Sequence, residues 1–178
     1  MFTEILYSYI TNPRKTIFLN KNKKPISACF LIIFLVTLAN IINLPYSKFI
    51  WFIGIGFFLI NCIILFIKSV IIDFIAQLFK LKSQSFKLFI WLGISNMPLI
   101  LAPIFNVILK PFFPTTLITF GLFICTCILA IITIKVLYNT SYKTSLLIYI
   151  IPFSVIALIV IGLFFGVISL AVANLQYL

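Results

Sequence analysis

The sequence SFKLFIWLGISNMPLILAPIFNVILK, residues Ser85 to Lys110, decides how the rest of the chain is organised. It is an apolar stretch of helical length, and it is interrupted by Gly93, Ser95, Asn96, Pro98 and Pro103. Each proline removes a backbone hydrogen bond that lipid cannot replace, so a broken helix in a membrane normally packs against other helices. The stretch therefore predicts a broken membrane span at the centre of a helical bundle.

The composition of the whole chain indicates an integral membrane protein. Of the 178 residues, 64% are hydrophobic and 8% are charged, and the mean hydropathy is +1.32. Soluble domains are usually ~45–50% apolar and ~25% charged. We therefore predict an all-α fold, a polytopic bundle in which a basic cytoplasmic or interfacial leader, residues 1–24, precedes a membrane domain, residues 25–178.

Five apolar runs predict five transmembrane helices, because a membrane core of ~30 Å needs roughly 20 helical residues. The runs cover residues 25–44, 49–79, 85–110, 115–134 and 146–175. The second run would be ~46 Å long as a helix, so part of it must tilt, bend or protrude. Lys68 marks its expected exit. Beyond it Asp73, Gln77 and Lys80 share one helical face, which predicts an amphipathic extension at the membrane surface.

The basic residues predict the orientation. With five spans, eleven of the thirteen Lys and Arg residues fall on the side of the leader, and the positive-inside rule makes this side cytoplasmic. The amino terminus is then inside and the carboxyl terminus outside. A split at Pro98 to Pro103 would give six spans but would move the later lysines to the wrong side. The leader itself has apolar residues at helical spacing before Pro13, which favours a short helix on the membrane surface.

The residue types argue against catalysis. The chain has no histidine and only two acidic residues, Glu4 and Asp73, so paired-carboxylate and metal-dependent chemistries lack their parts. We expect no catalytic residue, no cofactor and no metal site. The net charge of +11 is expected to attract anionic lipid headgroups rather than nucleic acid, because the basic residues lie between apolar runs.

Several polar and small residues are candidates for interaction or ligand binding. Asp73 either lies at the headgroups beside Lys80 and serves solubility, or it has a partner-binding or proton-linked role. The span asparagines either tie helices together or line a substrate cavity, and the GxxxG pair near the carboxyl terminus predicts a helix contact within this chain or with another. The full set of candidates is Asp73, Gln77, Lys87, Asn61, Asn96, Pro98, Asn106, Gly162 and Gly166.

The third span and the leader resemble the Yip1 family. Ser85, Phe86 and Lys87 match its polar-Phe-Lys element, and Gly93 and Pro98 match the small residue and proline that follow. The leader ILYSYITNPRKTIF, residues 5–18, resembles the bacterial form. The resemblance implies a five-span integral membrane protein. Eukaryotic members are linked to vesicle traffic and Rab-type GTPases, but this leader is too short to match their long cytosolic region.

Two hypotheses for function follow. The first is a non-enzymatic protein of a bacterial plasma membrane, as the predominance of lysine over arginine favours, acting in membrane organisation or trafficking. It would bind other membrane proteins, or itself, through the leader and residues 68–87. The alternative is a small transporter or substrate-binding membrane subunit with a site at the broken third span.

Overall fold

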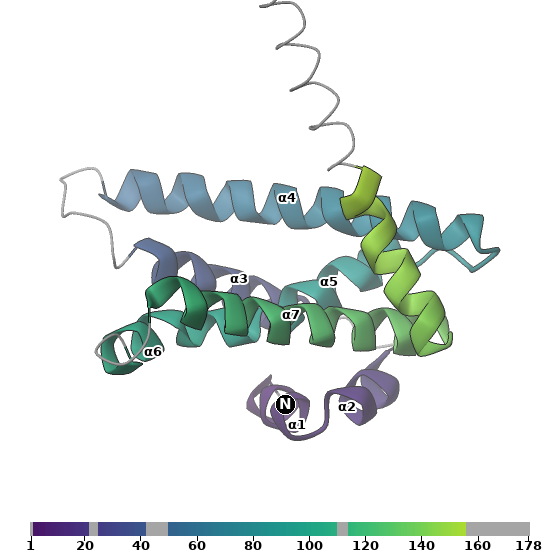
Figure 1. The fold of residues 1–178 in the computed structure, drawn as a ribbon, viewed down its shortest axis with the longest axis horizontal. Helices are drawn as coiled ribbons and strands as arrows, with labels where there is room; N and C mark the ends of the chain where they lie inside the picture. The colour runs from purple at the N-terminus through teal and green to yellow at the C-terminus, as the bar shows by residue number, and fades with distance from the viewer. Residues whose placement is uncertain (1, 22–24, 42–49, 110–113, 156–178) are drawn as a thin grey trace, which may run out of the picture.

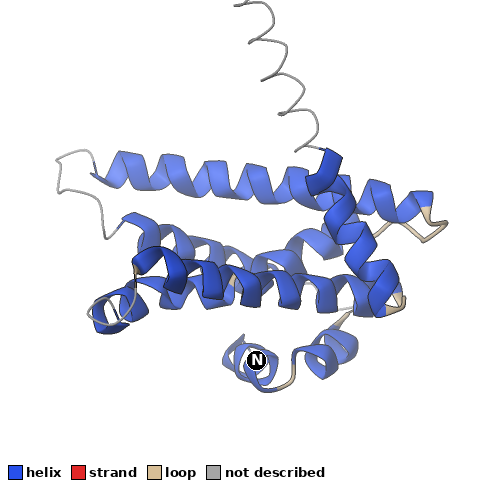
Figure 2. Cartoon of the chain, in the orientation of Figure 1, coloured by secondary structure: helices blue, strands red, loops and turns tan. Residues whose placement is uncertain are grey.

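The computed structural model of the chain describes residues 2–21, 25–41, 50–109 and 114–155. All regular elements in these ranges are helical, as Figure 2 shows. They are α1 (Phe2–Thr11), α2 (Pro13–Asn20), α3 (Ile26–Ile41), α4 (Ile50–Leu78), α5 (Ser85–Ser95), the 3₁₀ helix η1 (Met97–Leu101), α6 (Ala102–Leu109), α7 (Thr115–Tyr138) and a last helix, Tyr142–Val155.

The described residues are those of an all-helical membrane protein, as the composition predicted. Three helical stretches are long and apolar enough to cross a bilayer: Phe52–Leu78, Ser85–Leu109 and Thr115–Tyr138. The helices Ile26–Ile41 and Tyr142–Val155 are apolar but shorter than 18 residues, and the rest of the first and last predicted spans lies outside the described residues. Large apolar side chains along α4 are exposed, as expected for a surface that contacts lipid.

The prediction of a broken, central third span is confirmed. α5 lies between α3, α4 and α7 (Figure 1), and every residue from Leu88 to Ser95 is buried. After Asn96 the backbone changes to a 3₁₀ helix, in which the Leu99 amide donates to the Asn96 carbonyl at 3.0 Å. Pro98 has no amide hydrogen, so the α-helical pattern cannot continue through it. The helix resumes as α6.

Close packing of α3 on α5 depends on a glycine. A Cβ at Gly93 would overlap with Sγ of Cys29 on α3 and would lie 3.3 Å from Cδ2 of Leu65 on α4. Gly93 therefore lets three helices meet at one level of the bundle. This is the small residue that the sequence placed in the broken span.

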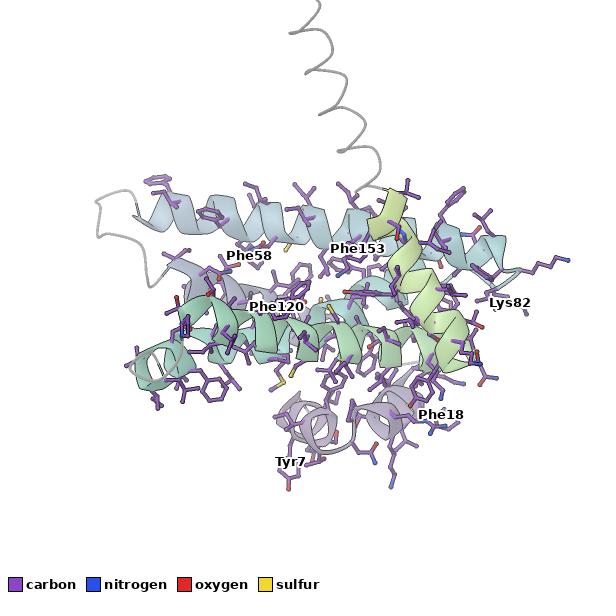
Figure 3. All side chains as sticks on the ribbon, in the orientation of Figure 1. Tyr7, Phe18, Phe58, Lys82, Phe120 and Phe153 are labelled. Atoms are coloured by element: carbon purple, nitrogen blue, oxygen red, sulfur yellow. The ribbon has the colours of Figure 1, made fainter. Side chains whose placement is uncertain are left out.

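Most of the second predicted run, residues 49–79, forms one helix, and the expectation that this helix leaves the membrane at Lys68 stays a prediction. α4 runs without a break to Leu78, and the last described helix packs against it at Lys68. Nζ of Lys68 lies 3.3 Å from the Tyr149 hydroxyl and 5.3 Å from the centre of the Phe153 ring, which Figure 3 labels. Aromatic rings thus shield this cation, and the helix continues past it, as expected.

Candidate functional site

The Asp73 carboxylate is buried in the last turns of α4, with 3% of the residue exposed. Its Oδ2 accepts hydrogen bonds from the Gln77 side chain at 2.9 Å and from the Ser83 hydroxyl at 2.6 Å. Its Oδ1 accepts from the Gln84 amide at 2.7 Å and from the Tyr138 hydroxyl. All four partners donate, which is the arrangement that an ionised carboxylate needs when water is absent.

The interpretation of Asp73 as a residue that serves solubility is therefore wrong, because its side chain is buried, whereas its position at the headgroups stays a prediction. Asp73 and Gln77 share one face of the helix, as predicted. At Asp73, however, this face is turned toward the interior of the protein. On the opposite face Phe74 is 59% exposed, and Leu78 is exposed as well. Three of the four donors, Ser83, Gln84 and Tyr138, lie beyond α4. Their hydrogen bonds stabilise the carboxylate in its buried position.

The network around Asp73 holds three parts of the protein together. Ser83 and Gln84 belong to the connection between α4 and α5, and Tyr138 is the last residue of α7. The Gln84 side chain also donates to the Leu137 carbonyl at 3.0 Å, which fixes the same connection to α7 a second time. The end of the bundle that carries Lys80 and Lys82 is thus rigidly organised, and Figure 3 shows Lys82 extending away from it.

The leader forms two helices that pack on the bundle, whereas one short surface helix was expected. Asn12 separates them and caps α2, because its side chain accepts from the Lys15 amide at 3.1 Å. Tyr9 is 1% exposed and stacks on Trp91 with ring centres 6.1 Å apart, and Ile17 is 0% exposed. Tyr7 points away from the bundle (Figure 3). The leader is therefore docked by its apolar side chains.

A basic cavity of about 400 Å³ lies between the leader and the end of α7. Arg14 and Lys15 from α2 and Lys135 from α7 supply three cationic side chains, and none of the residues that line it is acidic. The other lining residues are Asn12, Phe18, Val136, Asn139 and Thr140. Asn139 ends α7 in a left-handed conformation, with φ of 52°, which turns the chain at the cavity wall.

A second cavity of about 400 Å³ is almost entirely apolar and lies beside α1. Its lining comes from α1, from the broken segment η1 and from α7: Tyr9, Ile10, Met97, Pro98, Ile100, Leu101, Leu122, Cys125 and Leu129. The Tyr9 hydroxyl is buried beside the Thr133 hydroxyl, and neither atom has another hydrogen-bond partner among the described residues. Burial raises the pKa of the Tyr9 hydroxyl above its usual range, an effect that the nearby Thr133 hydroxyl partly offsets.

The candidate asparagines do not form one polar chamber. The Asn61 side chain donates to the Thr37 hydroxyl at 3.0 Å and so ties α4 to α3. Asn96 ends α5 through its backbone amide. Asn106 lines a separate, open cavity with threonines of α7, and neither Asn61 nor Asn96 takes part in that cavity. The helix-tying interpretation fits Asn61.

The remaining candidates have diverse positions. Pro98 lines the apolar cavity, and Lys87 is half-buried in the first turn of α5. Gly162 and Gly166 lie outside the described residues. Within the parts of the chain that the structure describes, no group of three or more His, Cys, Asp or Glu residues could hold a metal ion.

Sequence reasoning missed Tyr138, Gln84 and Tyr9. Tyr138 and Gln84 lie at helix ends with no motif around them, and only their contact with Asp73 gives them a role. Tyr9 carried a weak signal, since it lies on the apolar face of the leader.

Comparisons with protein-family models, with curated proteins and with solved structures found no match to this chain. The class that the fold defines is an all-helical integral membrane protein, and the Yip1 resemblance stays a prediction.

Proposed function

We propose that this chain is a non-enzymatic integral membrane protein of the Yip1 type that organises its membrane surroundings. It does so by binding other membrane proteins, or a second copy of itself, at its cationic face. We define the cationic face as α2, the connection between α4 and α5, and the residues that end α7.

The observation that supports this proposal most strongly is the docked leader. Ile17 and Tyr9 anchor α1 and α2 to the bundle, while Arg14 and Lys15 remain exposed. The Asp73 network fixes the neighbouring connection, where Lys80 and Lys82 are exposed. A rigid cationic surface loses little conformational entropy when a partner binds, so it suits recognition better than a flexible tail of the same charge.

The same proposal includes five spans and a cytoplasmic amino terminus in a bacterial plasma membrane. The first and last spans would extend α3 and Tyr142–Val155 with the apolar residues that follow each of them. This arrangement leaves eleven of the thirteen basic residues inside, as the positive-inside rule requires.

Cross-linking in intact membranes followed by purification in mild detergent tests the proposal. We expect one or more specific membrane proteins, or a dimer of this chain, to be captured from the cationic face. The variant Lys80→Gln/Lys82→Gln should reduce capture, whereas the variant Thr115→Ala/Thr116→Ala, at the other end of α7, should not. A chain that always emerges as a monomer without partners would contradict the proposal.

The transporter alternative has one supporting feature, the break between α5 and α6 beside a cavity. That cavity is apolar apart from Tyr9, so it offers no set of polar groups for a polar substrate. Uptake of a polar solute by liposomes that contain only this protein would favour the alternative.

A further inference from the structure

We propose that the leader and α7 together bind one anionic glycerophospholipid. Its phosphate occupies the basic cavity at Arg14, Lys15 and Lys135, and an acyl chain occupies the apolar cavity at Tyr9. The inference rests on the proposed function in one respect only, the position of this end of the bundle at the headgroups of a leaflet.

The basic cavity has the chemistry of a phosphate site. Arg14, Lys15 and Lys135 line one space of about 400 Å³ that has no acidic lining residue, and Nζ of Lys135 also lies 3.1 Å from the centre of the Tyr142 ring. Asn12, Asn139 and Thr140 add uncharged hydrogen-bonding groups. Such a concentration of like charge is unfavourable when empty, and an anionic group relieves it.

The apolar cavity lies along the same face of α7. Leu122, Leu129 and Val136 are seven residues apart, so they lie on one side of the helix, and Cys125 falls between the first two. From Leu129 to Lys135 the helix rises roughly 9 Å, since each residue adds about 1.5 Å. With this end of the bundle at the headgroups, as proposed, the two cavities would lie at the phosphate and acyl-chain depths of one lipid molecule.

Tyr9 gives the apolar cavity one unsatisfied polar atom. Its hydroxyl is buried beside the Thr133 hydroxyl, and neither atom has another partner among the described residues, so one of the two hydroxyl protons lacks an acceptor. A buried donor without an acceptor is costly. An ester carbonyl of a glycerolipid, which lies between phosphate and acyl chain, would supply the missing acceptor.

A phospholipid explains both cavities, whereas a soluble phosphate explains only the basic one. A protein segment is a weaker fit, because it would need an acidic group and an apolar group at this spacing. The occupant is therefore a lipid with a negatively charged headgroup.

The test uses the full chain purified in mild detergent and native mass spectrometry with phosphatidylglycerol and phosphatidylcholine as the two probes. We expect one phosphatidylglycerol per chain, bound at least ~10-fold more tightly than phosphatidylcholine. Because each surface cation contributes about fivefold in affinity for anionic lipid, the variant Arg14→Gln/Lys15→Gln/Lys135→Gln should weaken binding at least ~10-fold.

A matched control changes the net charge by the same amount outside the cavity. Lys80→Gln/Lys82→Gln/Lys143→Gln should retain phosphatidylglycerol within about twofold of the unmodified chain. An equal loss in both triple variants would overturn the proposal, because binding would then follow net charge alone. If the cavity variant unfolds at a lower temperature than the unmodified chain, the single variant Lys135→Gln is tested in its place. Its affinity for phosphatidylglycerol should fall about fivefold.

A second arm tests the acyl chain and separates a lipid from free phosphate. Cys125→Trp fills the apolar cavity and should weaken phosphatidylglycerol binding at least ~10-fold, while Ile128→Trp on the exposed side of α7 should not. Displacement of the lipid by 10 mM inorganic phosphate, with no effect of Cys125→Trp, would overturn the two-part site. Partner capture is measured in a separate experiment. A failure of lipid binding therefore does not contradict the proposed function, and a failure of partner capture does not contradict the lipid site.

Discussion

A buried carboxylate is stable only if other groups replace its water, and Asp73 receives four hydrogen bonds from the described residues. Two of these donors, the Gln84 amide and the Tyr138 hydroxyl, are themselves part of other elements. Losing one donor leaves a charged acceptor partly unsatisfied, which costs more than the loss of an exposed hydrogen bond. The residues around Asp73 therefore depend on one another.

Tyr138→Phe should lower the free energy of unfolding by about 1.5–3 kcal/mol, because it removes a hydrogen bond to a charged group and keeps the ring. Denaturation of the purified protein in detergent, followed by circular dichroism, measures this. Tyr142→Phe is the control, since Tyr142 is exposed, and its effect should stay within about 0.5 kcal/mol. Equal effects in both variants would show that Tyr138 does not stabilise the carboxylate.

The burial of the Asp73 side chain shows what the sequence could and could not predict at the scale of single residues. Helical spacing correctly placed Asp73 and Gln77 on one side of the helix. Which side faces the protein depends on Tyr138, 65 residues further along, and on a backbone amide that any residue at position 84 would supply. Neither partner leaves a local signal in the sequence.

At the scale of helices, the broken third span could be predicted because proline and glycine act through the backbone. Pro98 removes an amide wherever the helix packs. The docking of the leader could not be predicted in the same way, because apolar residues at helical spacing suit a lipid surface and a protein surface equally. Ile17 and Tyr9 happen to face protein.

Gly93→Ala should destabilise the protein by about 1–2 kcal/mol, because its Cβ would overlap with Cys29 on α3. Thermal unfolding in detergent measures the change. Gly121→Ala is a matched control in α7 with no atom within 4 Å of the added Cβ, and it should be neutral or stabilising by up to ~1 kcal/mol. In a Cys29→Ala background the cost of Gly93→Ala should shrink, and an unchanged cost would rule out the Cys29 contact as its cause.

Ile17→Ala should release the leader from the bundle, because it removes a fully buried side chain that anchors α2. Trypsin should then cleave after Arg14 and Lys15 about ten times faster than in the unmodified chain, as followed by mass spectrometry. Leu19→Ala changes an exposed position of the same helix and should leave the rate unaltered. Fast cleavage of the unmodified chain would mean that the leader is not docked.

At the scale of the whole molecule, the apolar composition was enough to predict a membrane protein. The distribution of charge predicts which end of the bundle lies on the cytoplasmic side. The loop after α4 and the start of α7 lie at opposite ends of the bundle (Figure 1). In a chain whose four cysteines are replaced by alanine, Lys82→Cys should react with an impermeant maleimide only from the cytoplasmic side, and Thr116→Cys only from the other. Labelling of both from one side would refute the proposed orientation.

The docked leader also constrains how the protein is made. Ile17 leaves the ribosome early, but the helix on which it rests begins at Thr115 and ends at Tyr138. At ~5–20 residues per second, translation of the intervening chain takes on the order of ten seconds. Throughout that interval Ile17 lacks the helix on which it packs, so a chaperone, the insertion machinery or the bilayer must cover α2 until α7 is in place.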